Sequence, residues 1–254
     1  EIWGGLIDLS ETPSPERSAG HRDEAALLWA ALTNQDGEDQ IVLRNERRYV
    51  ARLLPKPAKQ YPAYQIRPDG TYLITGGLGY LGLSFAKWLS TQGAQQLVLM
   101  GRSVPSPEAQ ATITQLQQQG RVLVLQADVA DQDDMARVFA ACAALPPIRG
   151  IIHAAGITPY RVIQEMQTDE LATVFRAKIS GAWLLHELTR HMPLDFFVCF
   201  SSAGSIWGAK GQAHYAAANH FLDSLAHYRR SLGLPALTIN WGLLAGQRLA
   251  SRDY

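Results

Sequence analysis

Short apolar segments alternate with amphipathic segments along most of the chain, and this alternation constrains the fold more than any other feature. The segments typical of strands are 71–75, 96–100, 122–126, 150–153, 195–201 and 236–241. The segments with apolar residues at helical spacing are 79–92, 106–119, 132–143, 167–191 and 212–232. Apolar strands separated by helices predict a parallel sheet that is covered on both faces. We expect a doubly wound α/β fold with the strand order 3-2-1-4-5-6.

A proline-rich segment separates this pattern from the first part of the chain. Residues 55–70 contain four prolines, which favour an extended connector. Before them we expect a strand from Trp3 to Leu9, a helix from Glu24 to Leu32, and a hairpin with arms at 40–44 and 48–54 around a turn at Asn45-Glu46. This first part is too small for a persuasive core of its own. We therefore divide the chain into a small part (1–54), a connector (55–70) and a main α/β part (71–254).

Composition and charge exclude several classes of function. The 254 residues include 23 basic and 23 acidic ones, and this balance gives no sign of a nucleic-acid partner. No apolar run approaches the roughly 20 residues of a membrane-spanning helix. Cys142 and Cys199 lie in segments that we expect to be buried. This favours two reduced thiols in a cytoplasmic protein. Neither cysteine has a second Cys or His at the spacing of a metal site. The chain starts at Glu1 without a signal-peptide pattern, so we expect it to be a piece of a longer protein.

A glycine-rich turn follows the first strand of the main part. It reads Thr75-Gly76-Gly77-Leu78-Gly79-Tyr80-Leu81-Gly82 and leads into a helical pattern. Glycines between a strand and a helix permit a tight turn and a close approach of the backbone, so that the helix N-terminus faces a pyrophosphate. The alternative is a turn that binds no ligand. We predict a dinucleotide site.

Two further segments bear on which dinucleotide would bind. Gly101-Arg102-Ser103 follows the second strand, where an NAD enzyme usually has an acidic residue for the ribose hydroxyl. An arginine there favours the extra phosphate of NADP, although Arg102 could also be a solvated loop charge. Asp128-Val129 follows the third strand and suits a place near the adenine; alternatively, Asp128 caps the next helix.

Four polar residues form a candidate catalytic set. Ser202 lies at the end of the fifth strand, Tyr215 follows 13 positions later on the next helix, Asn219 lies one turn beyond it, and Lys178 lies in the preceding helix. A ketone that accepts hydride develops negative charge on its oxygen, which needs a proton donor and a fixed hydrogen bond. A nearby ammonium favours the phenolate form of a tyrosine and so prepares it for proton transfer. Taken singly, Lys178 could be a solvated helix residue, Tyr215 a half-buried aromatic residue and Ser202 a helix cap.

This set resembles the active site of short-chain dehydrogenases, with Lys and Asn exchanged as in the ketoreductases of modular polyketide synthases and animal-type fatty acid synthases. The resemblance covers residues 71 to about 247. It implies that Tyr215 is the general acid, that Ser202 binds the carbonyl oxygen, that Lys178 tunes Tyr215 and contacts the nicotinamide ribose, and that Asn219 holds the lysine or a relay water. It also implies that His153-Ala154-Ala155-Gly156 lies on the cofactor side, with His153 structural.

The resemblance extends to the substrate and to the rest of the protein. It implies NADPH-dependent reduction of a β-ketoacyl chain that an acyl carrier protein presents, next to other synthase domains in the same polypeptide. Residues 1–54 resemble the end of the structural subdomain that precedes the catalytic one in these synthases. Past residue 246 the family continues into lid helices, whereas this chain stops at Tyr254.

Three sequence features bear on stereochemistry. Trp207 lies eight residues before Tyr215, as in A-type ketoreductases, and Thr158-Pro159-Tyr160 replaces the Leu-Asp-Asp of B-type domains. Gln212, three residues before Tyr215, leans to the A1 subtype. The resemblance thus implies an L-configured alcohol, unless Trp207 only packs in its loop. Two other functions remain open, namely a related reductase for another carbonyl substrate and a redox-inactive nucleotide-binding scaffold.

Overall fold

The computed structural model describes residues 6–9, 24–34, 36–44, 47–57 and 64–242. The chain divides into two compact units, Glu1–Pro62 and Ala63–Tyr254. The division falls inside the proline-rich segment 55–70. Within the described part, no helix is long and apolar enough to cross a membrane.

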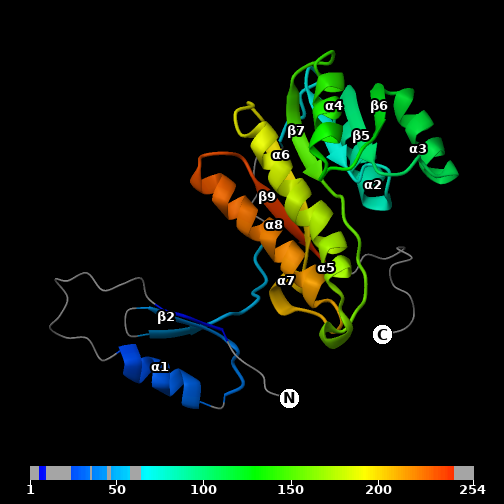
Figure 1. Ribbon diagram of the computed structural model, residues 1–254. Helices are drawn as coiled ribbons and strands as arrows, with labels where there is room; N and C mark the ends of the chain where they lie inside the picture. The colour runs from blue at the N-terminus through cyan, green and yellow to red at the C-terminus, as the bar shows by residue number, and fades with distance from the viewer. Residues whose placement is uncertain (1–5, 10–23, 35, 45–46, 58–63, 243–254) are drawn as a thin grey trace. The chain divides into compact units, whose positions relative to one another are not determined.

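The larger unit is built on a six-stranded sheet with the order β6-β5-β4-β7-β8-β9. Every neighbouring pair is parallel. Because β4 is the first strand of this unit, the order corresponds to 3-2-1-4-5-6, and the predicted doubly wound topology is confirmed (Figure 1). The strands are β4 (Thr71–Thr75), β5 (Gln96–Gly101), β6 (Arg121–Gln126), β7 (Ile148–His153), β8 (Phe196–Ser202) and β9 (Leu237–Trp241).

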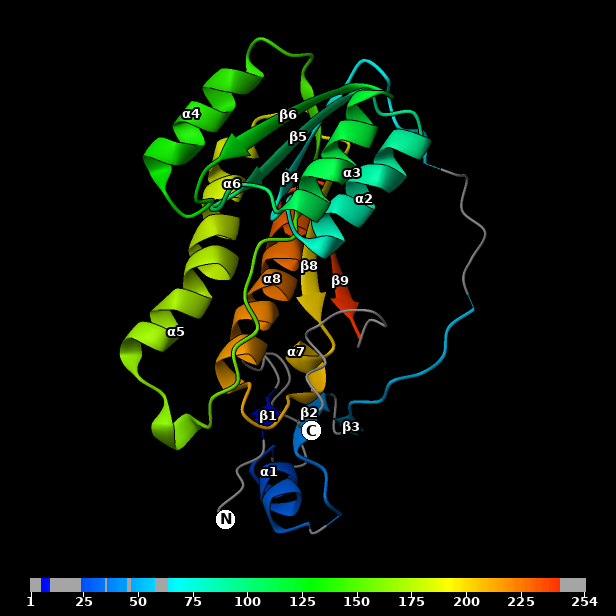
Figure 2. The ribbon, with the colours of Figure 1, turned by 90° about the vertical axis from the view of Figure 1, so that its right-hand side faces the viewer.

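Both faces of this sheet are buried. Along β4, Tyr72 and Ile74 belong to one core cluster and Leu73 to the other, as the two-residue period of a strand requires. The first cluster includes α2 (Tyr80–Thr91) and α3 (Pro107–Gln117). The second includes α4 (Gln132–Cys142), α6 (Ala182–Thr189) and α8 (Ala213–Ser231). Figure 2 shows α2 and α3 on one side of the sheet and α4 and α6 on the other. The strands of this sheet are therefore apolar along their length because both faces of the sheet are buried.

The predicted single helix over 167–191 is wrong in its centre. The segment consists of α5 (Thr168–Phe175), a π-helical turn (Arg176–Gly181) and α6. At Gly181 an added Cβ would lie 2.6 Å from Val129 Cγ1, so a residue without a side chain allows the turn to pack closely against its neighbour. π-Helical turns inside helices occur often at functional sites, and this one carries Lys178. Two further short elements, a 3-10 turn (Ile163–Glu165) and α7 (Gly204–Trp207), lie outside the predicted segments.

The smaller unit holds a three-stranded sheet and one helix. β1 (Leu6–Asp8) pairs in parallel with β2 (Gln40–Arg44), which pairs antiparallel with β3 (Arg47–Val50); the helix is α1 (Glu24–Thr33). The second hairpin arm, which is predicted to reach Leu54, ends at Val50. Residues 51–57 are exposed and lie outside the sheet. The predicted turn at Asn45-Glu46 and the start of the strand predicted from Trp3 lie outside the described residues.

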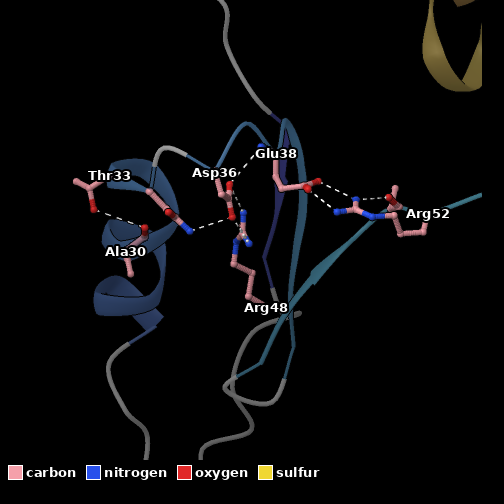
Figure 3. Close-up of polar contacts among 8 residues, drawn as sticks. Ala30, Thr33, Asp36, Glu38, Arg48 and Arg52 are labelled. Carbon is pink, nitrogen blue, oxygen red and sulfur yellow. Dashed lines mark hydrogen bonds and ion pairs between the residues drawn. The ribbon is translucent and has the colours of Figure 1, made fainter.

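Ion pairs tie the smaller unit together at its surface. Asp36 pairs with Arg48 over 2.8 Å, and Glu38 pairs with Arg52 (Figure 3). Such exposed pairs contribute little individually. The buried apolar residues described in this unit form a small core of Ala31, Ile41 and Leu43.

Candidate active site

A groove with a volume of about 390 Å³ lies at the carboxyl ends of the central strands. In doubly wound sheets, ligands bind outside this edge, where the strand order reverses. Predicted cofactor residues that line the groove are Gly76, Leu78, Gly79, Arg102, Ser103, Asp128, Val129, Ala154, Ala155 and Gly156. Lining residues that the sequence analysis missed are Met100, Gly101, Val104, Ser106, Ala127 and Ala177. Most of these residues are next to a predicted residue in the chain, and this adjacency could have identified them as lining residues.

The glycine-rich turn has the shape that a pyrophosphate cradle needs. Gly76 adopts a φ of 65°, and a Cβ there would lie 2.7 Å from the backbone of Ala154. A Cβ on Gly82 would lie 2.3 Å from the Gly76 carbonyl oxygen, so only glycine lets α2 approach the turn this closely. Gly79 directly precedes α2, and its nearest contact for a Cβ, at 3.4 Å, is an ordinary one. The helix N-terminus is therefore open to an anion, and the residues present fit a dinucleotide.

Other predicted cofactor residues do not belong to the lining of the groove. Thr75 and His153 are buried, and Thr75 Oγ1 lies 2.7 Å from His153 Nδ1. Burial lowers the pKa of His153 to about 3, with the Lys178 charge acting in the same direction, so the imidazole is neutral. The Gly77 backbone approaches Leu99 and the Ile74 carbonyl oxygen. The Leu81 side chain packs on the core, and Tyr80 is exposed.

Asp128 belongs to the groove and does not cap the next helix. The N-cap of α4 is Asp131, whose carboxylate accepts the N–H groups of residues 133 and 134. Asp128 instead accepts hydrogen bonds from the Ala130 N–H at 2.9 Å and from Arg176 Nε at 2.9 Å. Burial alone would raise the pKa of Asp128, but the Ala130 N–H and the Arg176 guanidinium lower it below its usual value. A carboxylate thus lies in the lining of the groove, at the end of the strand next to the one that Arg102 follows.

Lys178 is buried, with 6% of its surface exposed. Its Nζ donates a hydrogen bond to the Phe200 carbonyl oxygen at 2.9 Å. Burial lowers the pKa of Lys178 to about 8, so the ammonium still predominates at neutral pH. Gly156 makes room for this side chain, because a Cβ at residue 156 would lie 2.7 Å from Lys178 Cε. The alternative of a solvated helix lysine is therefore wrong.

Tyr215 and Lys178 come together from different helices. Tyr215 lies in the first turn of α8 and is half-buried, and Lys178 Nζ lies 5.6 Å from the centre of its ring. Asn219 is fully buried one turn further along α8, and its Nδ2 donates to the Tyr215 carbonyl oxygen at 2.8 Å. Asn219 Oδ1 has no hydrogen-bond partner among the described residues, so it does not hold the ammonium directly, contrary to one of the two expected roles.

Ser202 ends β8, two residues after Phe200, whose carbonyl oxygen binds Lys178. Its Oγ accepts a hydrogen bond from the Gly204 N–H at 3.2 Å, which leaves the hydroxyl hydrogen to donate to a substrate oxygen. The preceding Ser201 donates to the Asn219 carbonyl oxygen at 3.2 Å and so connects the strand end to α8.

Of the two stereochemical candidates, Trp207 ends α7 with 54% of its surface exposed, and Gln212 directly precedes α8. Among the described residues, no group of His, Cys, Asp and Glu could hold a metal ion.

Comparison with known proteins identifies the family that has this site. The family model described as "KR domain" matches residues 70–246, which are more than half of the chain. This chain belongs to the KR domain family.

Relatives of this KR domain are polyketide synthases and their ketoreductases. It is 39% identical over 253 residues to the polyketide synthase GfsA of Streptomyces halstedii, covering 99% of this chain and 3% of that protein. The ketoreductase from the first module of phoslactomycin biosynthesis in Streptomyces sp. HK803 is 37% identical with a TM-score of 0.84, covering 99% of this chain and 57% of that one. A structure of A-type ketoreductases from a modular polyketide synthase is 36% identical with a TM-score of 0.81, covering 97% of this chain and 52% of that one. The chain thus spans a small part of the curated relatives, and the KR domain is an oxidoreductase domain of the polyketide synthase kind.

Proposed function

We propose that this KR domain reduces the β-keto group of an acyl chain to a β-hydroxyl with NADPH while an acyl carrier protein presents the chain. The single observation that supports this most is the buried ammonium of Lys178 beside the Tyr215 ring, next to a groove that fits a dinucleotide. A bound reduced nicotinamide supplies the hydride for such a reduction. The protein's residues supply orientation and the proton.

Each of the four polar residues has a proposed role in proton transfer. The Tyr215 hydroxyl donates the proton to the oxygen that becomes the alcohol, and the Ser202 hydroxyl donates a hydrogen bond to the same oxygen. The Lys178 ammonium stabilises the phenolate that remains after transfer. Asn219 fixes the first turn of α8 through the Tyr215 carbonyl oxygen and offers its buried Oδ1 to a relay water.

The preference for NADPH over NADH rests on Arg102. This arginine lines the groove directly after β5, where NAD enzymes usually carry an acidic residue. A guanidinium binds a phosphate with several hydrogen bonds, whereas an acidic residue would repel it. Asp128 and Val129 are assigned to the adenine side, and Gly76 and Gly79 to the pyrophosphate.

The substrate side of the proposal rests on Trp207. With 54% of its surface exposed after the catalytic strand, its indole is available to bias the side from which the chain enters. We propose an A-type domain of the A1 subtype, with Gln212 as the second determinant and an L-configured alcohol as the product. The carrier protein and the other synthase domains are the proposed partners, and the cytoplasm the proposed location.

The experiment follows NADPH absorbance with a β-ketoacyl thioester and analyses the alcohol by chiral chromatography. We expect turnover and an L-configured product. Tyr215→Phe is expected to abolish turnover while NADPH fluorescence still reports binding. Binding without turnover in the unaltered protein would instead indicate a redox-inactive scaffold, and a D-configured alcohol would contradict the A-type assignment.

A further inference from the structure

A partly buried polar cluster joins three elements behind Ser202. Ser205 of α7 donates its hydroxyl hydrogen to Asp223 Oδ2 of α8 over 2.6 Å. Asn240 of β9 donates its amide to the same carboxylate oxygen over 3.0 Å and to the Ser205 hydroxyl oxygen over 2.7 Å. Hydrogen bonds to a carboxylate are roughly twice as strong as those between neutral groups. Asp223 is therefore the acceptor that dominates the cluster.

Asn240 connects the carboxylate to the strand that carries Ser202. Its Nδ2 also lies 3.3 Å from the Ser202 carbonyl oxygen. A carboxylate and a carbonyl can only accept hydrogen bonds, so Asp223 and Ser202 together fix the amide with its nitrogen toward them. On the other side of the turn, the Gly204 N–H donates to Ser202 Oγ. The backbone from Ser202 to Ser205 is thus held at one end by Asn240 and at the other by the Ser205 side chain, and both of these groups bind Asp223.

Asp223 also lies on the same face of α8 as Tyr215 and Asn219, since the three residues are spaced by four. Asp223 Oδ1 is buried and has no hydrogen-bond partner among the described residues. A buried carboxylate oxygen without a partner is costly, and the two hydrogen bonds that Oδ2 accepts offset part of that cost.

The charge of Asp223 reaches Lys178. Burial lowers the pKa of Lys178 to about 8, and negative charge on Cys199 or Asp223 opposes this fall. Burial raises the pKa of Cys199 to about 12, so that thiol is uncharged near neutral pH. Asp223 is thus the carboxylate that favours the ammonium, whose other titratable neighbours are Tyr215 and His153, the second of which is neutral.

On the basis of the ketoreductase function proposed above, we infer that Asp223 is a positioning residue of this active site. Its carboxylate orients Asn240, which holds the Ser202 backbone. The same carboxylate orients Ser205 and with it α7, which ends at Trp207. Asp223 therefore acts through other residues on the hydrogen bond to the substrate oxygen and on the side from which the substrate enters.

The test compares two variants of the full chain that carry the same chemical change. Asp223→Asn keeps the size of the side chain but removes its charge, which weakens the two hydrogen bonds that Oδ2 accepts. Asp195→Asn is the matched control: Asp195 is also partly buried, with a buried Oδ2 that has no hydrogen-bond partner among the described residues, but it precedes β8 at the end away from Ser202. For each variant we would measure kcat and KM with a β-ketoacyl thioester, the ratio of the two alcohols, the melting temperature, and hydrogen–deuterium exchange of residues 202–208.

Asp223→Asn is expected to lower kcat at least tenfold, change KM less than threefold, and change the alcohol ratio at least fivefold. Its kcat should also fall at a lower pH on the alkaline side, because the ammonium loses a favourable charge. Hydrogen–deuterium exchange of residues 202–208 should accelerate. For Asp195→Asn, kcat, KM, the alcohol ratio and the exchange rates of residues 202–208 should each stay within about twofold of the values of the unaltered protein. The pH and stereochemical changes are readouts that a merely structural role would not move.

Ser205→Ala keeps the test decisive if Asp223→Asn does not fold. It removes one donor to the carboxylate and leaves Asn240 in place, so the same changes in alcohol ratio and exchange are expected, but smaller. Unchanged ratio and unchanged exchange in the variants that fold would overturn the inference. If the unaltered protein reduces no ketone, the proposed function fails, while the exchange of residues 202–208 still decides whether Asp223 orders this turn.

Discussion

The side-chain nitrogen of Lys178 lies 5.6 Å from the centre of the Tyr215 ring, although the two residues belong to different helices. The π-helical turn brings Lys178 to this place and buries it, and the Phe200 carbonyl oxygen accepts its hydrogen bond. Burying an ammonium without a carboxylate in contact is unfavourable. The fall of its pKa from 10.5 to about 8 corresponds to roughly 3 kcal/mol.

Lys178→Met is expected to stabilise the fold while abolishing reduction. The methionine fills the same space without a buried charge, and the loss of the hydrogen bond to Phe200 offsets part of the gain, leaving about 1–2 kcal/mol. This corresponds to a rise of a few degrees in the melting temperature. Lys87→Met, at an exposed position of α2, serves as the control and should leave the melting temperature nearly unchanged. A clear fall in the melting temperature of Lys178→Met would contradict the prediction.

The advantage of Lys178→Met should depend on pH. The pKa of Lys178 is lower in the folded protein than in the unfolded chain, so the folded state favours the neutral amine. Below pH 8 the unaltered protein carries the full penalty of the buried ammonium, and the penalty disappears as the pH rises from about 8 to about 10.5. Urea titrations of both proteins should therefore show a stability difference that shrinks over this range. A constant difference would mean that the charge is not its source.

The pH profile of kcat/KM should fall on its alkaline side near pH 8. The ammonium of Lys178 loses its proton there, and the neutral amine no longer stabilises a phenolate on Tyr215. Initial rates measured across pH 6 to 10 check this, with circular dichroism at each pH to show that the fold persists. Activity that stays flat to pH 10 would argue against the assigned role of the lysine.

Gly156→Ala is expected to lower kcat about tenfold or more with only a small loss of stability. The new Cβ would lie 2.7 Å from Lys178 Cε, so the flexible lysine must move and its ammonium leaves its place beside Tyr215. Gly242→Ala is the control, because a Cβ there would meet no atom of the described residues within 4 Å. Steady-state kinetics and thermal unfolding of the two variants separate displacement of the lysine from general damage. Equal kcat in both variants would show that the lysine tolerates the shift.

Arg102→Glu is expected to reverse the preference between the two nicotinamide cofactors. The new carboxylate would repel the extra phosphate of NADPH and suit the free ribose hydroxyl of NADH. The ratio of kcat/KM for NADPH to that for NADH should fall at least a hundredfold. Arg121→Glu makes the same charge change at the start of β6, away from the groove, and should leave the ratio unaltered. An unchanged ratio in Arg102→Glu would place the phosphate elsewhere.

Local patterns in the sequence were sufficient for the topology and for the position of the groove. Apolar strands such as 71–75 and helices such as 79–92 follow from the period of the side chains and from burial on both faces of the sheet. The glycines from Gly76 to Gly82 predicted the turn because only glycine permits its φ angle and its close approaches. These features depend on residues near each other in the chain.

Only the tertiary structure decided the charge states and the hydrogen bonds between elements. Nothing local to Lys178 reveals its burial, the π-helical turn around it or the Phe200 carbonyl oxygen that it binds. That Asp128 binds Arg176, 48 residues away in the chain, likewise depends on how the elements pack. The cluster of Asp223 with Asn240 joins α8 to β9, 17 residues apart in the chain. Desolvation and hydrogen bonding across elements depend on which segments meet in space, and no short-range pattern in the chain encodes that.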